Sequence, residues 1–127
     1  MVAFQLTGMK VKSGNIKQVS AAEAITVGQA VTTGGEACDA SDAGKLLFAG
    51  FATNNADVGG IVAYAGAGAV LETTESVTNL RSYCMKTAGQ IDLEENLASG
   101  ESYIILGYTN NDGDLVVGAR TSGISKP

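Results

Sequence analysis

The sequence has no histidine and no tryptophan, and only one proline among its 127 residues. Without histidine, the chain cannot build a Ser-His-Asp triad, a Cys-His pair or a zinc site with imidazole ligands. Aromatic residues make up only 6% of the chain, although 45% of it is hydrophobic. We therefore expect one small domain whose core is built mainly from small side chains.

Acidic residues are missing from the first 22 positions, which contain three lysines. The rest of the chain has five basic and 13 acidic residues, which gives it a net charge of −8 against +3 for the first 22 positions. Such an acidic body argues against binding to nucleic acids or to anionic membranes. No run of residues has the length of a membrane span or the pattern of a signal peptide. We expect a soluble protein made in the cytoplasm.

The two cysteines are too few for a disulfide framework, and no metal-ligand spacing surrounds Cys38 or Cys84. We expect both to be reduced and to act as small apolar side chains. Cys84 shares one face of an extended chain with Lys86, but no partner base is evident, so a catalytic thiolate is not expected.

Other polar motifs are better explained as turns and loops than as binding or catalytic sites. The Asn110-Asn-Asp-Gly-Asp114 segment lacks the spacing of a calcium-binding loop, because its glycine comes too early. Gly66-Ala-Gly68 is not followed by the lysine of a phosphate-binding loop. Carboxylate pairs occur at Glu72/Glu75, Glu94/Glu95 and Asp112/Asp114. Because few aromatic residues are present to form a sugar platform, we interpret these pairs as solvated loop acids. The sequence predicts no catalytic residue, no metal site and no cofactor.

Glycine is abundant, with 17 residues that separate short runs of valine, isoleucine and leucine, as is typical of turns in an all-β protein. The runs 46–52 and 102–108 are apolar at both alternating positions. This pattern predicts that both faces of each strand are covered, by the core on one side and by a second sheet or a neighbouring subunit on the other. The apolar residues among the first 22 positions follow no clean helical or strand period. We expect an arm there with at most one stable strand.

Two parts of the chain resemble each other. The ten residues from Leu46, with the sequence Leu-Leu-Phe-Ala-Gly-Phe-Ala-Thr-Asn-Asn, lie over Ile-Ile-Leu-Gly-Tyr-Thr-Asn-Asn from Ile104. In this alignment Gly50 falls on Gly107. Short β units resemble one another in any case, so a chance similarity stays open as an alternative.

The similarity divides the chain into halves at about 24–68 and 78–123. Neither half would bury its apolar face alone. We predict a single all-β domain over 23–127, a small β-barrel or β-sandwich with approximate internal duplication, and an N-terminal arm over 1–22.

Two segments resemble the decoration (cement) proteins of tailed-bacteriophage capsids. They are Ile25-Thr-Val-Gly-Gln-Ala-Val31 and Gly50-Phe-Ala-Thr-Asn-Asn-Ala-Asp-Val-Gly-Gly-Ile-Val-Ala-Tyr64. In that family a G-x-x-V strand opens the body, and an apolar-Gly-apolar strand, a turn and a Gly-x-Val-x-Val strand complete it. Gly107-Tyr-Thr-Asn-Asn-Asp-Gly-Asp-Leu-Val-Val117 supplies a second copy of the last pattern. The resemblance covers about residues 24–120, and the arm lies outside it.

The resemblance implies a non-enzymatic virion protein that binds the outer surface of the assembled capsid and bridges major capsid subunits. Members of the family sit on the capsid as dimers or trimers, so a homo-oligomer is expected. The doubly apolar strands and the basic arm would supply the contacts with the capsid or with another subunit. The candidate contact residues are Lys10, Lys12, Lys17, Phe48, Phe51, Tyr103, Ile105 and Tyr108.

Two other functions stay open at this point. One is a different virion or surface assembly module, such as a head fibre base or a tail-tube component. The other is a carbohydrate-binding β module. That module would need an exposed aromatic platform, with Tyr64, Tyr83, Tyr103 and Tyr108 lining one face.

Overall fold

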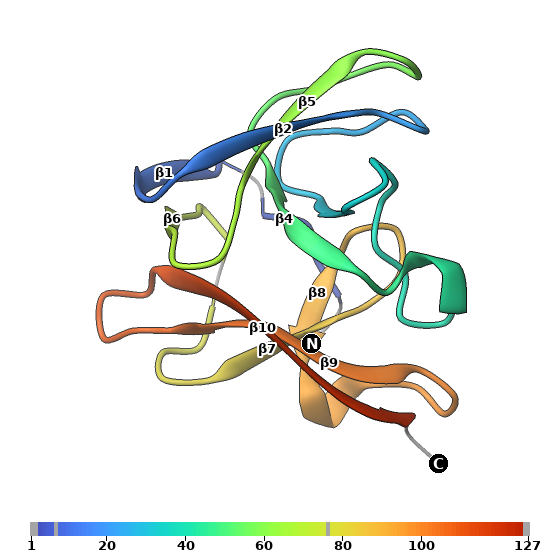
Figure 1. The fold of residues 1–127 in the computed structure, drawn as a ribbon. Coiled ribbons are helices and arrows are strands. Elements are labelled where there is room, and N and C mark those ends of the chain that lie inside the picture. The colour runs from blue at the N-terminus through green and yellow to red at the C-terminus, as the bar shows by residue number, and fades with distance from the viewer. Residues whose placement is uncertain (1–2, 7, 76, 126–127) are drawn as a thin grey trace.

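Two antiparallel sheets make up the fold in the computed structural model, which describes residues 3–6, 8–75 and 77–125 (Figure 1). The backbone alone is described for residue 94 and for 119–125. The six-stranded sheet has the order β1-β6-β10-β9-β7-β8, and the four-stranded sheet has the order β2-β5-β4-β3. The strands are β1 (Lys10–Ser13), β2 (Ile16–Ser20), β3 (Ala30–Thr32), β4 (Phe48–Ala52), β5 (Ile61–Ala65), β6 (Val70–Glu72), β7 (Ser82–Met85), β8 (Ile91–Leu93), β9 (Ser102–Thr109) and β10 (Leu115–Ser125). The prediction of an all-β barrel or sandwich is confirmed.

The main core lies where the two sheets face each other. Phe51 of β4 enters it from the four-stranded sheet, while Tyr83, Leu106 and Leu115 enter it from the six-stranded sheet. Alanines and glycines fill much of the space between the larger side chains, as the composition indicates. A smaller cluster forms on the opposite face of the four-stranded sheet, because neighbouring residues of a strand point to opposite sides. It contains Ala21, Ile25, Val31, Ala37, Ala52 and Val62.

The two halves of the chain have a similar order of elements, although β8 has only an isolated bridge between Val31 and Ala37 as its counterpart. A short 3₁₀ helix, η1 (Ala43–Lys45), precedes β4, and a second one, η2 (Glu94–Asn96), precedes β9. β4 pairs with β3 and β5, just as β9 pairs with β7 and β10. The outer neighbour of β5 is β2, and the outer neighbour of β10 is β6. Each half therefore contributes the centre of one sheet.

The first 22 residues form two strands, so the expectation of an arm with at most one stable strand is wrong. β1 pairs with β6 in the larger sheet, and β2 pairs with β5 in the smaller one. Leu6 is fully buried in the main core, and the Phe4 ring makes an edge contact with the Tyr83 ring at 5.8 Å. The partner strands lie far along the sequence, and the outer positions of β1 and β2 are exposed. Met9-Lys-Val-Lys12 alternates apolar and charged residues and predicts a half-exposed strand, which β1 confirms, whereas Ile16-Lys-Gln-Val-Ser20 has no such alternation.

The two runs that are apolar at both alternating positions differ in how they are covered. In β4, Phe51 and Ala52 are both fully buried, one in each hydrophobic cluster, so both faces of this strand are covered by the same chain. In β9, Ile104 and Leu106 are buried, but Tyr108 is 53% exposed. The prediction of two covered faces is confirmed for Phe51 and Ala52 of β4, although Leu47, just before this strand, is 73% exposed. At Tyr108 the same chain leaves the outer face of β9 uncovered, and the predicted cover by a neighbouring subunit stays a prediction there.

Candidate interaction surface

β1 and β2 form one continuous edge that runs along both sheets (Figure 1). Each is the first strand of its sheet, and only Gly14 and Asn15 separate them. The outer backbone groups of both strands have no strand partner among the described residues. An unpaired strand edge is a template for another chain, which would add a strand to it.

The lysines of this edge differ in their partners. The Lys12 ammonium lies 2.8 Å from Asp114 Oδ2 at the β9–β10 hairpin. The hydrogen bond to Asp114, followed by the charge of the same carboxylate, raises the pKa of Lys12. Lys12 is therefore already engaged within the molecule. Lys10 and Lys17 form no ion pair with any described side chain. Lys10 lies across from Glu72 of β6, whereas Lys17 lies across from the neutral Tyr64 of β5.

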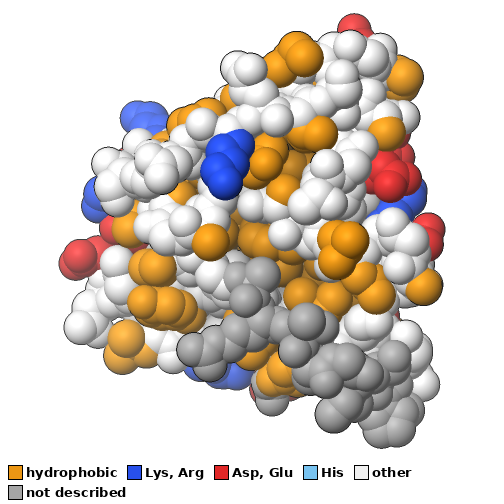
Figure 2. All heavy atoms as spheres, in the orientation of Figure 1, with side chains coloured by type: hydrophobic (Ala, Val, Ile, Leu, Met, Phe, Trp, Pro, Cys, Tyr) orange, Lys and Arg blue, Asp and Glu red, His pale blue; other side chains and the backbone are white. Residues whose placement is uncertain are grey.

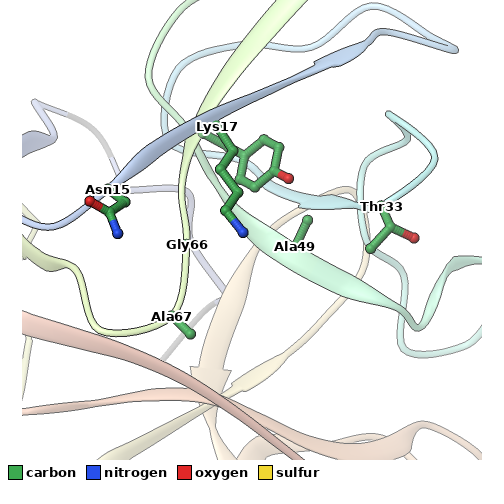
Figure 3. Close-up of a pocket in the computed structure, with 7 residues that line it drawn as sticks. Asn15, Lys17, Thr33, Ala49, Gly66 and Ala67 are labelled. Carbon is green, nitrogen blue, oxygen red and sulfur yellow. The ribbon is translucent and has the colours of Figure 1, made fainter.

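A hollow of about 310 Å³ opens beside β2 (Figure 3). Its walls come from the β1–β2 turn, the end of β3, β4, β5 and the turn after β5. Polar side chains supply part of the lining, and small residues supply the rest: Asn15, Lys17, Thr33 and Tyr64, then Ala49, Gly66 and Ala67. Figure 2 shows the same side of the molecule, where hydrophobic side chains gather in the middle around one basic side chain.

A second exposed feature lies at the end of β9. Tyr108 is 53% exposed, and Leu80 is 69% exposed. Leu80 lies near this end of β9, because its backbone N–H donates to the carbonyl of Thr109, the residue after Tyr108, at 3.1 Å. The backbone of Leu80 has a φ of 59°, an unfavourable conformation for a residue with a β-carbon. Tyr103 and Ile105, on the same strand, are half-buried.

The two phenylalanines among the candidate contact residues face inward. Phe51 is 0% exposed in the single chain, so its side chain belongs to the core and cannot reach a partner. Phe48 is half-buried and packs edge-on against Phe51, with ring centroids 5.2 Å apart. The apolar character of Phe48 and Phe51 is therefore explained by packing between the sheets and requires no contact with a partner.

The tyrosines do not share one face. Tyr83 is fully buried, and its hydroxyl accepts a hydrogen bond from the Thr78 N–H at 2.9 Å. Tyr64 belongs to the four-stranded sheet, whereas Tyr103 and Tyr108 lie on β9 of the other sheet. This arrangement counts against the aromatic platform that a carbohydrate-binding module requires.

Both cysteines are buried, and neither forms a disulfide. Burial raises the pKa of the Cys38 thiol from its usual value near 9.0 to about 12, so this thiol stays protonated at neutral pH. Lys86, which the sequence places on the same face as Cys84, binds Glu101 with its ammonium at 2.5 Å from Glu101 Oε1. The sequence did not indicate this ion pair, because 15 residues separate its partners.

No three potential metal ligands among the described His, Cys, Asp and Glu residues lie close enough together to hold a metal ion. Within the described chain, no helix is long and apolar enough to cross a membrane. The described surface has an exposed strand edge, a hollow beside it and several exposed apolar side chains, including Leu47, Val58, Leu80 and Tyr108. Comparisons of the chain with protein-family models, with curated proteins and with solved structures found no match.

Proposed function

We propose that this chain is a structural virion protein that binds the outer surface of a tailed-phage capsid and stabilises it by bridging major capsid subunits. The observation that carries the proposal is the continuous basic edge formed by β1 and β2, on a body whose net charge is negative. A basic strand edge suits an extended or acidic segment of another protein. Combined with the resemblance of residues 24–120 to decoration proteins, this favours a capsid as the partner.

Two physical effects would make such binding stabilise the particle. A protein that binds only the assembled lattice shifts the equilibrium toward that lattice by mass action. Contact with several capsid subunits at once, or through a homo-oligomer, adds avidity without requiring strong single contacts. No catalytic residue, cofactor, nucleic acid or membrane is needed for this function.

Co-sedimentation with expanded, empty capsids that lack this protein tests the proposal. We expect the wild-type chain to sediment with the capsids and to saturate at a fixed copy number. A chain that stays in the supernatant at every concentration would contradict the proposal. Retention of the chain on a glycan column, without capsid binding, would favour a carbohydrate-binding module instead.

Variants of the edge sharpen the test. The double variant Lys10→Met/Lys17→Met removes two positive charges that have no described ion-pair partner, so the fold should be preserved. We expect it to bind capsids more weakly and with a smaller salt dependence. Lys45→Met/Arg81→Met is the control for net charge, because it removes two positive charges elsewhere on the surface, from the pairs with Glu23 and Glu95. Equal binding by the two double variants would show that the edge is not the contact.

A further inference from the structure

The described lining of the hollow beside β2 has one positively charged side chain and no negatively charged one. Lys17 extends from β2 with its ammonium directed toward Gly66 and Ala49 (Figure 3). Its strand neighbour is Tyr64, which lies directly across from it in the pairing of β2 with β5. Among the described residues, no acidic side chain lines the hollow and none forms an ion pair with Lys17. The site therefore presents an exposed lysine without an ion-pair partner beside a concave surface.

The remaining polar groups suit the same kind of ligand. Asn15 and Thr33 line the hollow on either side of Lys17, and Figure 3 shows the Thr33 hydroxyl on the side away from the Lys17 ammonium. The Asn15 amide offers a hydrogen-bond donor. The Tyr64 hydroxyl, also part of the lining, is a further donor. A lysine ammonium with neutral donors around it favours an anion.

The size and charge of the hollow restrict which anion it can bind. A volume of about 310 Å³ is at the lower end of the range for small-molecule sites, so it admits a small group and not a large cofactor. One lysine neutralises one charge, whereas phosphate recognition typically uses an arginine fork or several cations. The small apolar surfaces of Ala49, Gly66 and Ala67 suit a short aliphatic stem.

Another hollow in the molecule provides a contrast. It has a similar volume, about 280 Å³, and is also lined by a lysine, Lys45. Glu23 lies in the same lining, with its carboxylate 3.7 Å from the Lys45 ammonium. The charge of that hollow is neutralised from within, so an anion gains little there. The hollow at Lys17 lacks such a carboxylate.

We propose that the hollow lined by Lys17 and Tyr64 binds a single carboxylate group on a short aliphatic stem. The carboxylate comes either from an acidic side chain of another protein or from a free short-chain carboxylic acid. This inference concerns one ligand group and stands independently of the proposed capsid function.

Titration of the ¹⁵N-labelled chain, followed by its amide NMR signals, tests the site. One arm uses N-acetyl-glutamate N-methylamide, which represents an acidic side chain in a protein. The other arm uses butyrate, which represents a free acid. The neutral counterparts are N-acetyl-glutamine N-methylamide and butyramide. We expect saturable shifts at the amides of Lys17, Tyr64, Gly66 and Ala67 with at least one carboxylate, and none with its neutral counterpart.

The arms distinguish the sources. Tighter binding of the blocked glutamate identifies a protein side chain as the ligand, and tighter binding of butyrate identifies a free acid. Lys17→Met should weaken binding about tenfold, as loss of one charge-assisted hydrogen bond predicts. Lys17→Arg should retain binding, and Lys10→Met, which removes the same charge from β1, should leave it unchanged. Shifts that do not saturate with either carboxylate, or that are equal for the neutral compounds, would overturn the proposal.

Discussion

Gly50 and Gly107 occupy equivalent places in the two sheets. Gly50 lies on β4 opposite Val31, and Gly107 lies on β9 opposite Tyr83. In both pairings the register shifts by one residue immediately beside the glycine. At both positions an added Cβ would come closer than 3.0 Å to a carbonyl oxygen of the neighbouring strand, that of Ala65 or that of Val116. The alignment of the two halves thus corresponds to one shared backbone arrangement.

Substitution of either glycine by alanine should destabilise the fold. The neighbouring carbonyl is backbone and cannot move without disturbing the sheet, so Gly50→Ala and Gly107→Ala should each lower the free energy of unfolding by about 1–3 kcal/mol. Urea denaturation measures this loss. Gly118→Ala on β10 is the control, because an added Cβ meets nothing within 4 Å there. A loss of equal size in the control would contradict the steric explanation.

The Lys86–Glu101 ion pair should matter more than an exposed pair. Its side chains are only 12% and 6% exposed, and Glu101 also accepts a hydrogen bond from the Ala98 N–H. Glu101→Gln leaves the buried Lys86 ammonium without a counter-charge and with only the Asn96 carbonyl, 2.9 Å away, so this substitution should cost about 3 kcal/mol. Disruption of the exposed pair by Glu95→Gln should cost less than about 1 kcal/mol. Thermal and urea unfolding of both variants would reveal whether burial makes this difference.

Cys38 should make the fold less stable at alkaline pH. Its pKa in the folded protein, about 12, lies above its usual value near 9.0, so above pH 9 the unfolded chain releases a proton that the folded chain retains. The contribution of the protonated Cys38 thiol to the free energy of unfolding is therefore fully present below about pH 9 and is lost as the pH rises toward 12. Relative to Cys38→Ala, the wild type should lose about 1.4 kcal/mol of unfolding free energy between about pH 8 and pH 10. Parallel pH profiles of the two proteins would be inconsistent with a buried, protonated thiol.

The sequence predicted those features of the fold that depend on neighbouring residues. Both Asn-Asn turns are hairpin turns, and Asn54 and Asn110 each use the side-chain oxygen to accept a backbone N–H from the far side of the turn. Gly113 has the positive φ that the Asp-Gly signal indicates. Such turns depend on local conformation, which the residue types determine.

Features that depend on distant partners were missed. The first strands pair with β6 and β5, and no residue near them in the sequence indicates this. Lys12 could be recognised as basic, but its contact with Asp114, 102 residues further along the chain, could not be predicted. The same holds for the hollow at Lys17, which draws its lining from separate elements of the chain. Charge and alternation are local properties, whereas a pocket is a property of the whole fold.

Leu80 offers a test that separates stability from binding. Its positive φ places a branched side chain in a conformation that favours glycine, although 69% of that side chain is exposed and contributes little to the core. Leu80→Gly should therefore raise the free energy of unfolding by about 0.5–1 kcal/mol, after the entropic cost of glycine is included. Ala88 has a similar φ of 53°, so Ala88→Gly should stabilise the fold to a similar extent.

The two variants should differ in capsid binding if Leu80 and Tyr108 form part of the contact. Leu80→Gly removes an exposed apolar side chain near the Tyr108 end of β9, whereas Ala88→Gly removes only a methyl group in a different turn. We expect Leu80→Gly to bind expanded capsids more weakly than the wild type, and Ala88→Gly to bind them equally well. A gain in stability together with a loss of binding would explain why a strained leucine occupies this turn, because the contact would require the side chain that the fold disfavours. Unchanged binding by both variants would restrict the contact to the β1–β2 edge.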